Sequence, residues 1–205
     1  FSGAFRWDGR QWQHFQVAAD SGEMKVHKIK KDRRNRLWFL GISAHYPQIP
    51  SYQPGAYVYE HGTFTRWGVP EGLNNGRVYA FDEAADGSLW FGTYLGLCQW
   101  KDGNWRYWSK AEGLRTNRVF TLAVDQENNV WFGDYSEPGY GLGYIGKDRK
   151  VTYLGRNEGL IDERVLDLKI DRFNALWIST QNGMSCYDAG NWITFDRNTG
   201  LHHSA

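Results

Sequence analysis

The chain alternates short apolar segments with polar, glycine-containing turns, and the same arrangement recurs four times. A tryptophan between apolar residues marks each recurrence, and it lies twelve positions after a valine. The four pairs are Val26 and Trp38, Val78 and Trp90, Val119 and Trp131, and Val165 and Trp177. The segments alternate as strands do, and a helical period of 3.6 is absent. The pattern therefore indicates copies of one β-rich unit.

Each unit predicts four short strands. The first two cover 119–124 and 130–133 in one unit, and the last two cover 96–100 and 105–108 in the unit before it. Asp8-Gly9 and Asp102-Gly103 close hairpins, because a tight primed turn needs positive φ. Four antiparallel strands in about 41 residues are typical of a β-propeller blade. We predict an all-β propeller that forms one domain over residues 1–205, with units at approximately 1–22, 23–73, 74–114, 115–160 and 161–201.

The first unit contains only the third and fourth strands. The sequence thus predicts five hairpins formed by third and fourth strands, but only four formed by first and second strands. To complete a fifth blade, 16 residues equivalent to 78–93 are needed. Proteins rarely leave strand edges uncovered. We expect four full blades plus a half blade, five-bladed if closed or part of a larger ring. Remaining blades of the same protein, or another chain, would complete the ring.

The composition agrees with a propeller fold and limits the kinds of partner that the chain is expected to bind. Aromatic residues make up 17% of the chain and there are 24 Gly, which favours short strands joined by turns. The net charge of +1 gives no argument for nucleic acid or an anionic membrane surface. No apolar run approaches the ~18 residues that span a bilayer, so we expect no membrane insertion in this segment. Cys98 and Cys186 are too few for a disulfide framework, and a bridge between them is not expected.

Most of the aromatic residues are predicted to pack between blades. The four repeated tryptophans occupy one position of the unit, which indicates inter-blade packing. The aromatic residues of the fourth strands are predicted to pack between sheets as well, with a sugar-stacking patch on the rim as the alternative. These are Trp12, Phe15, Phe64, Trp67, Trp105, Trp108, Trp192 and Phe195.

The repeated stretches resemble the two-component regulator propeller repeat. The resemblance lies in Gly-Leu, then Arg-Val, then apolar-Trp-apolar, in 72–93, 113–133 and 159–180. Two departures are Ala84, which stands where Asp125 and Asp171 stand, and Gly22-Glu23 in place of Gly-Leu. The resemblance implies a propeller in the sensor region of a bacterial hybrid two-component regulator, periplasmic or extracellular, whose ligands are often poly- or oligosaccharide fragments.

The connections of variable length are predicted to share one face of the propeller. Antiparallel order places the turn between the second and third strands beside the connection between units. One cation enters each first strand there, and the loops 42–54 and 134–140 present further polar and aromatic groups. Such a face could bind an anion or a carboxylated sugar, whereas pairing of the cations with neighbouring carboxylates is the alternative. The predicted ligand-binding residues are Lys25, Arg77, Arg118, Arg164, His45, Tyr46, Tyr52, Tyr94, Tyr135, Glu137 and Tyr140.

The first strands are predicted to line a central channel. In the last unit Leu166, Leu168 and Ile170 alternate with Val165, Asp167 and Lys169, which predicts an apolar face and a charged face. The corresponding charges of the other units are Lys28, Lys30 and Asp82. Charges of both signs indicate a hydrated channel with salt bridges, and an acid/base pair acting on a ligand is the alternative.

Three classes of function follow. We expect a ligand-binding sensor module, part of a larger signalling protein, that recognises a saccharide or another small polar ligand on the loop face and is not an enzyme. The alternatives are a scaffold for protein–protein interaction and a polysaccharide lyase or hydrolase that uses His45 or a channel carboxylate. No cofactor and no metal site are expected, since no calcium-loop or His-Glu-x-x-His motif occurs.

Overall fold

The computed structural model describes residues 3–15, 17, 25–41, 55–134 and 139–201, and it is built from antiparallel sheets. One sheet has two strands and four sheets have four strands, each in sequence order. The predicted all-β architecture of four full blades and a half blade is therefore confirmed. The short helices are single 3-10 turns that follow the fourth strand of each full blade: η1 (Val69–Glu71), η2 (Lys110–Glu112), η3 (Arg156–Glu158) and η4 (Arg197–Thr199).

The half blade is β1 (Ala4–Trp7) and β2 (Trp12–Phe15). Blade 1 is β3 (Val26–Lys31), β4 (Leu37–Gly41), β5 (Ala56–Glu60) and β6 (Thr63–Trp67). Blade 2 is β7 (Val78–Glu83), β8 (Leu89–Thr93), β9 (Gly96–Lys101) and β10 (Asn104–Trp108). Blade 3 is β11 (Thr121–Val124), β12 (Val130–Gly133), β13 (Leu142–Ile145) and β14 (Val151–Leu154). Blade 4 is β15 (Val165–Ile170), β16 (Leu176–Thr180), β17 (Gly183–Asp188) and β18 (Asn191–Phe195).

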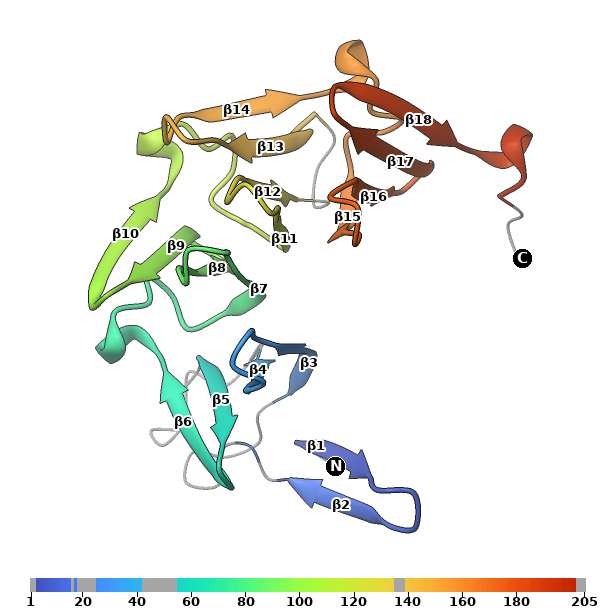
Figure 1. The fold of residues 1–205 in the computed structure, drawn as a ribbon. Helices are drawn as coiled ribbons and strands as arrows, with labels where there is room; N and C mark the ends of the chain where they lie inside the picture. The colour runs from blue at the N-terminus through green and yellow to red at the C-terminus, as the bar shows by residue number, and fades with distance from the viewer. Residues whose placement is uncertain (1–2, 16, 18–24, 42–54, 135–138, 202–205) are drawn as a thin grey trace.

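The blades lie side by side along an arc, with β3, β7, β11 and β15 on its inner side and β6, β10, β14 and β18 on its outer side (Figure 1). The core is therefore divided into layers between neighbouring blades. Phe81 and Phe91 of blade 2 pack with Trp38 of blade 1, and Leu122 of blade 3 packs with Trp90 of blade 2. None of the helices in the described residues is long and apolar enough to cross a membrane.

The repeated tryptophans anchor these layers, as predicted. Trp38 and Trp90 are fully buried, and Trp131 is 6% exposed. Trp38 stacks on Phe81 of the next blade with ring centroids 4.5 Å apart, and Trp131 contacts Tyr187 of the next blade at 5.4 Å. The prediction for the fourth strands is wrong for Trp12, which is 67% exposed. Trp12 is the first residue of β2, and its ring contacts that of Trp7 in β1 at 5.4 Å.

A side-chain hydrogen bond holds each repeated tryptophan; it is buried at Trp38, Trp90 and Trp131 and partly buried at Trp177. The indole N–H donates to a carboxylate six residues earlier, with N–O distances of 2.9 Å to Asp32, 3.1 Å to Asp125 and 3.0 Å to Asp171. In blade 2, where Ala84 replaces the aspartate, the Trp90 N–H donates instead to the Ser88 hydroxyl at 3.2 Å. The missing carboxylate is thus replaced by a hydroxyl, so the departure from the repeat pattern leaves no buried donor unsatisfied.

The hydrogen bonds of Asp86 predict that blade 2 loses stability in acid. Its carboxylate accepts hydrogen bonds from Lys101 at 2.8 Å and from the Ser88 hydroxyl at 2.7 Å. Burial disfavours the charge, but these bonds outweigh it and lower the pKa of Asp86 to about 2. Because the pKa is lower in the folded than in the unfolded state, the stability gained is present above about pH 4 and lost as pH falls toward 2.

We therefore expect the unfolding free energy of the wild type to fall between pH 4 and 2 more steeply than that of Asp86→Asn, which cannot take up this proton. Urea unfolding at several pH values measures both slopes. The comparison isolates Asp86 because every other carboxylate is common to both proteins. Parallel curves would show that Asp86 contributes no acid sensitivity.

The two cysteines form no bridge. Cys98 lies on β9 and Cys186 on β17, in sheets separated by blade 3, and both are free and buried. Burial raises the pKa of the Cys98 thiol to about 12, so the reactive thiolate is scarce near neutral pH. The expectation of unpaired cysteines is confirmed.

Candidate ligand-binding face

Hydrogen bonds join the connections between blades to the central turns of the sheets. The Asn74 amide, which precedes β7, donates to the Leu95 carbonyl in the β8–β9 turn at 3.0 Å. Arg115, which precedes β11, donates to the Tyr140 carbonyl before β13 at 3.1 Å. Asn182 of the β16–β17 turn donates to Asp162 before β15 at 2.8 Å. These segments form one surface, which we call the loop face: 72–77, 94–95, 113–118, 139–140, 159–164 and 181–182.

Two of the predicted cations flank one predicted tyrosine on this face. The guanidinium carbon of Arg77 lies 5.1 Å from the Tyr94 ring centroid, and that of Arg118 lies 5.8 Å from it. Arg77 comes from blade 2 and Arg118 precedes the first strand of blade 3, so the cluster spans an inter-blade boundary. Tyr94 remains 38% exposed. Among the described residues, neither arginine forms an ion pair, so the cluster keeps a positive charge at the surface.

The other predicted residues are dispersed. Arg164 donates to the side-chain carbonyl of Gln181, and Lys25 is exposed just before β3. Tyr140 is half-buried, and its carbonyl accepts from Arg115. The remaining predicted residues lie outside the described part of the chain: His45, Tyr46, Tyr52, Tyr135 and Glu137.

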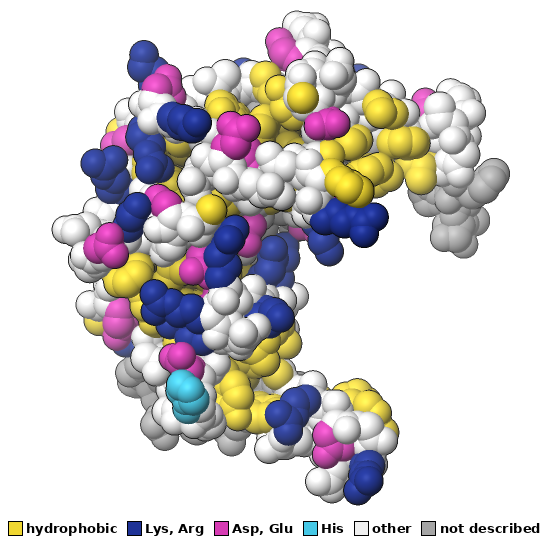
Figure 2. Space-filling view, viewed as in Figure 1, with side chains coloured by type: hydrophobic (Ala, Val, Ile, Leu, Met, Phe, Trp, Pro, Cys, Tyr) yellow, Lys and Arg dark blue, Asp and Glu magenta, His cyan; other side chains and the backbone are white. Residues whose placement is uncertain are grey.

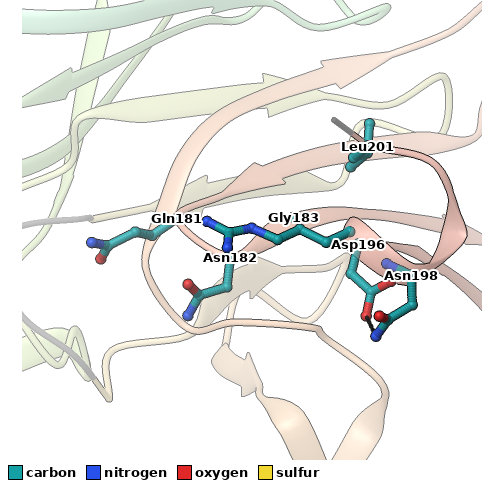
Figure 3. Close-up of a pocket in the computed structure, with 7 residues that line it drawn as sticks. Gln181, Asn182, Gly183, Asp196, Asn198 and Leu201 are labelled. Carbon is teal, nitrogen blue, oxygen red and sulfur yellow. Dashed lines mark hydrogen bonds between the residues drawn. The ribbon is translucent and has the colours of Figure 1, made fainter. Parts of the chain in front are cut away.

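A polar cavity lies beside Arg164, between blades 3 and 4. Its volume is about 300 Å³, and Gly139, Arg156 and Gln181 contribute to its wall. Arg156 pairs with Asp162 of the same wall at 2.8 Å. A larger hollow of about 740 Å³ opens next to it on blade 4, and polar side chains of the β16–β17 turn and of the segment after β18 line it (Figure 3). The loop face therefore combines half-buried arginines with polar recesses.

A layer of aromatic side chains on the inner strands was not predicted. The His27 ring N–H donates to the Tyr79 carbonyl at 3.0 Å, and the two rings are 6.2 Å apart. The Tyr79 and Phe120 rings are 4.4 Å apart. Burial lowers the pKa of His27 and outweighs its backbone hydrogen bonds, so the imidazole is mainly neutral at pH 7. The layer is an uncharged surface next to the arginines that precede the same strands.

β-Bulges explain why this layer was missed. The register of the first strands shifts between Val26 and Lys28, and likewise between Val165 and Asp167 in blade 4. A bulge inserts one residue and reverses the alternation on one side of it. The predicted alternation is therefore wrong at the start of the strand, where Leu166 is 45% exposed and Val165 is fully buried. Beyond the bulge Leu168 is buried as predicted. The available signal was an aromatic residue directly after the repeated valine, at His27, Tyr79 and Phe120.

Deeper on the inner strands the predicted salt bridges are present. Lys28 of β3 pairs with Asp167 of β15 at 3.1 Å, which joins blades 1 and 4 across the inside of the arc. Asp167 also accepts from the Thr121 hydroxyl at 3.0 Å. Burial works against ionisation, but the Lys28 charge and these hydrogen bonds keep the pKa of Asp167 below its usual value. Lys30 lies 3.9 Å from Asp82, and Figure 2 shows Lys and Arg side chains along the inner edge of the arc.

Comparison with known proteins confirms the repeat resemblance. Residues 72–95 and 113–136 match the model of the two-component regulator propeller, so the chain contains these repeats. Both matches begin at a Gly-Leu turn of the loop face and end after the second strand of a blade. No curated protein compared with the chain matches it.

Similar solved structures agree with the fold. The extracellular domain of the hybrid two-component system BT3049 from B. thetaiotaomicron has a TM-score of 0.74 and 17% identity, covering 95% of this chain and 26% of that one. The extracellular domain of BT4673 from the same organism has a TM-score of 0.64 and 20% identity, covering 85% and 24%. A catalytically inactive virginiamycin B lyase from Staphylococcus aureus with Quinupristin has a TM-score of 0.67 and 15% identity, covering 91% and 60%.

The chain thus spans about a quarter of the length of the two sensor chains that it matches. At these identities the likeness shows the propeller fold, which sensor domains and a lyase share.

Proposed function

We propose that this chain is a ligand-recognition propeller of the sensor type, which binds a carboxylated saccharide on its loop face without turning it over. The observation that carries the proposal is Tyr94 between Arg77 and Arg118, on an exposed surface that two blades build together. A tyrosine ring offers an apolar face to sugar C–H groups. A guanidinium offers charge-assisted hydrogen bonds to a carboxylate.

The neutral layer beside the arginines favours the same ligand class. Tyr79 and Phe120 present two rings in contact, tilted at 54° to each other, and such rings suit a sugar better than a small inorganic anion. The matches to extracellular sensor domains support a site outside the cytoplasm and a role in signalling. The remaining blades of the ring, from the same protein or another chain, would add to the binding surface.

Binding of uronic acid oligosaccharides tests the proposal. We expect the wild type to bind them more tightly than neutral oligosaccharides of equal length, with an affinity that falls as salt increases. Arg118→Ala removes one charge-assisted contact and is expected to weaken binding roughly tenfold. Isothermal titration calorimetry measures both effects.

Arg106→Ala is the matched control. Arg106 is an exposed arginine on β10, an outer strand, so this variant loses the same charge away from the loop face. It should bind as the wild type does. Equal affinity for acidic and neutral oligosaccharides, or unchanged binding by Arg118→Ala, would contradict the proposed site.

A further inference from the structure

The contact between blades 3 and 4 differs from the two contacts before it. In blade 1 the fourth-strand Trp67 packs against Trp38 at 5.3 Å, and in blade 2 Trp108 packs against Trp90 at 5.0 Å. In blade 3 the equivalent position, opposite Leu142 in the sheet, is Leu154. A leucine is much smaller than a tryptophan, so Trp131 lacks the indole that covers its counterparts.

A cavity of about 500 Å³ lies at this position and includes Trp131 and Leu154 in its wall. Its volume is in the range of small-molecule sites. Tyr144 and Tyr187 stand on either side, with ring centroids 4.5 Å and 5.4 Å from that of Trp131. The turns 125–129 and 188–190 also line it, and they lie at the ends of the blades opposite the loop face. It is therefore separate from the saccharide site proposed above.

The wall of this cavity is acidic. Asp125, Glu127 and Asp188 line it, and no Lys, Arg or His does so among the described residues. Glu127 and Asp188 are exposed, and their side chains form no hydrogen bond or ion pair within that part of the chain. Burial and then the charge of Asp125 raise the pKa of Tyr144. The carboxylates thus give the aromatic recess a negative potential.

The neighbouring contact shows what such a recess accommodates. Between blades 2 and 3, the guanidinium carbon of Arg149, from the β13–β14 hairpin, lies 5.8 Å from the Trp90 ring centroid. The corresponding β17–β18 hairpin has Ala189 and Gly190 at its turn and carries no cation to Trp131. The chain thus places its own cation, Arg149, at Trp90, whereas carboxylates line the recess at Trp131.

We propose that the recess between blades 3 and 4 is a second binding site, which takes an organic cation: a guanidinium or primary ammonium group on an aliphatic chain. The cation lies against the face formed by Trp131, Tyr144 and Tyr187, where the ring quadrupoles attract it. Glu127 and Asp188 accept its N–H groups, and the aliphatic chain packs on Leu154. The cationic group would make at Trp131 the contact that Arg149 makes at Trp90, and the aliphatic chain would fill the space that Trp108 fills there.

Agmatine and N-acetylarginine amide are the probes, and N-acetylcitrulline amide is the neutral control of equal shape. We expect saturable binding of both cations and none of the citrulline compound, measured by calorimetry. Leu154→Trp restores the tryptophan that blades 1 and 2 carry and is expected to abolish binding. The double variant Glu127→Gln, Asp188→Asn is expected to weaken it roughly threefold to tenfold.

Asp102→Asn is the matched control, because Asp102 is an acidic residue of the equivalent hairpin in blade 2. It should leave binding unchanged. Glu127 and Asp188 are exposed, so their substitution tests the site even if Leu154→Trp fails to fold, which circular dichroism reveals. Binding of the citrulline compound with equal affinity, the absence of saturable cation binding, or full affinity in the double variant would each overturn the proposal.

Discussion

Trp38→Ala is expected to lower the free energy of unfolding by about 3–5 kcal/mol, the usual cost of removing a buried tryptophan side chain. Trp38 is fully buried at the contact between blades 1 and 2. Its ring stacks on Phe81 at 4.5 Å and meets Phe91 edge-on at 5.6 Å. An alanine would leave a cavity among rigid aromatic rings that are fixed in two different sheets, so relaxation of the surroundings would recover little of the loss.

Urea unfolding followed by circular dichroism measures this effect. The matched control is Trp12→Ala, because Trp12 is 67% exposed on the half blade, and it should change stability by less than about 1 kcal/mol. If both variants lose the same stability, or if Trp38→Ala loses less than the control, the tryptophan layer does not hold the blades together.

The repeated pattern was sufficient to predict the fold. Blades 1 to 3 each bury the same tryptophan against the next blade, so the physical requirement recurs in the sequence and can be recognised by its period. Ala84 marks a feature of blade 2 that the repeat predicts only in part. The pattern identifies the missing aspartate, but the replacement by Ser88 depends on a side chain four residues away that happens to reach the Trp90 N–H.

The candidate site could be predicted only in part. The repeat places one cationic residue directly before each first strand. The approach of Arg77 and Arg118 to one tyrosine, however, depends on the spacing between two blades. The part of the aromatic layer at His27 and Tyr79 was hidden by the bulges of blades 1 and 2, since a one-residue insertion changes which side chains share a face. Local alternation cannot reveal such an insertion.

The cavity at Trp131 was harder still to predict. The sequence shows that Leu154 stands where Trp67 and Trp108 stand. A smaller residue leaves open space only if its neighbours do not fill it, and here Tyr144 and Tyr187 remain at the sides of the ring. Such packing is a property of three strands from two blades, not of any one segment.

The second large effect is expected from Asp32→Ala, which should lower the free energy of unfolding by about 2–4 kcal/mol. The carboxylate of Asp32 accepts from the Trp38 indole at 2.9 Å and from the Arg36 side chain at 2.6 Å. It also accepts from the backbone N–H groups of Arg34 and Arg36. Burial disfavours its charge, yet these donors keep the pKa of Asp32 below its usual value. Alanine would leave the buried indole N–H without an acceptor.

Asp32→Asn separates the loss of acceptors from the loss of charge. Its amide oxygen can still accept a hydrogen bond from Trp38, so we expect Asp32→Asn to lose about half as much stability as Asp32→Ala. Urea unfolding of the two variants beside Ser88→Ala, which removes the neutral acceptor of Trp90, compares the two ways of holding the tryptophan. The Ser88 hydroxyl also donates to the charged Asp86 carboxylate, so Ser88→Ala is compared with its parent in the Asp86→Asn background. Only neutral hydrogen bonds are lost there, and a neutral hydrogen bond contributes less than a charged one, so Ser88→Ala should cost about 1 kcal/mol. An equal or larger loss for Ser88→Ala would show that the carboxylate gives no advantage over the hydroxyl at this position, and that Ala84 costs blade 2 nothing.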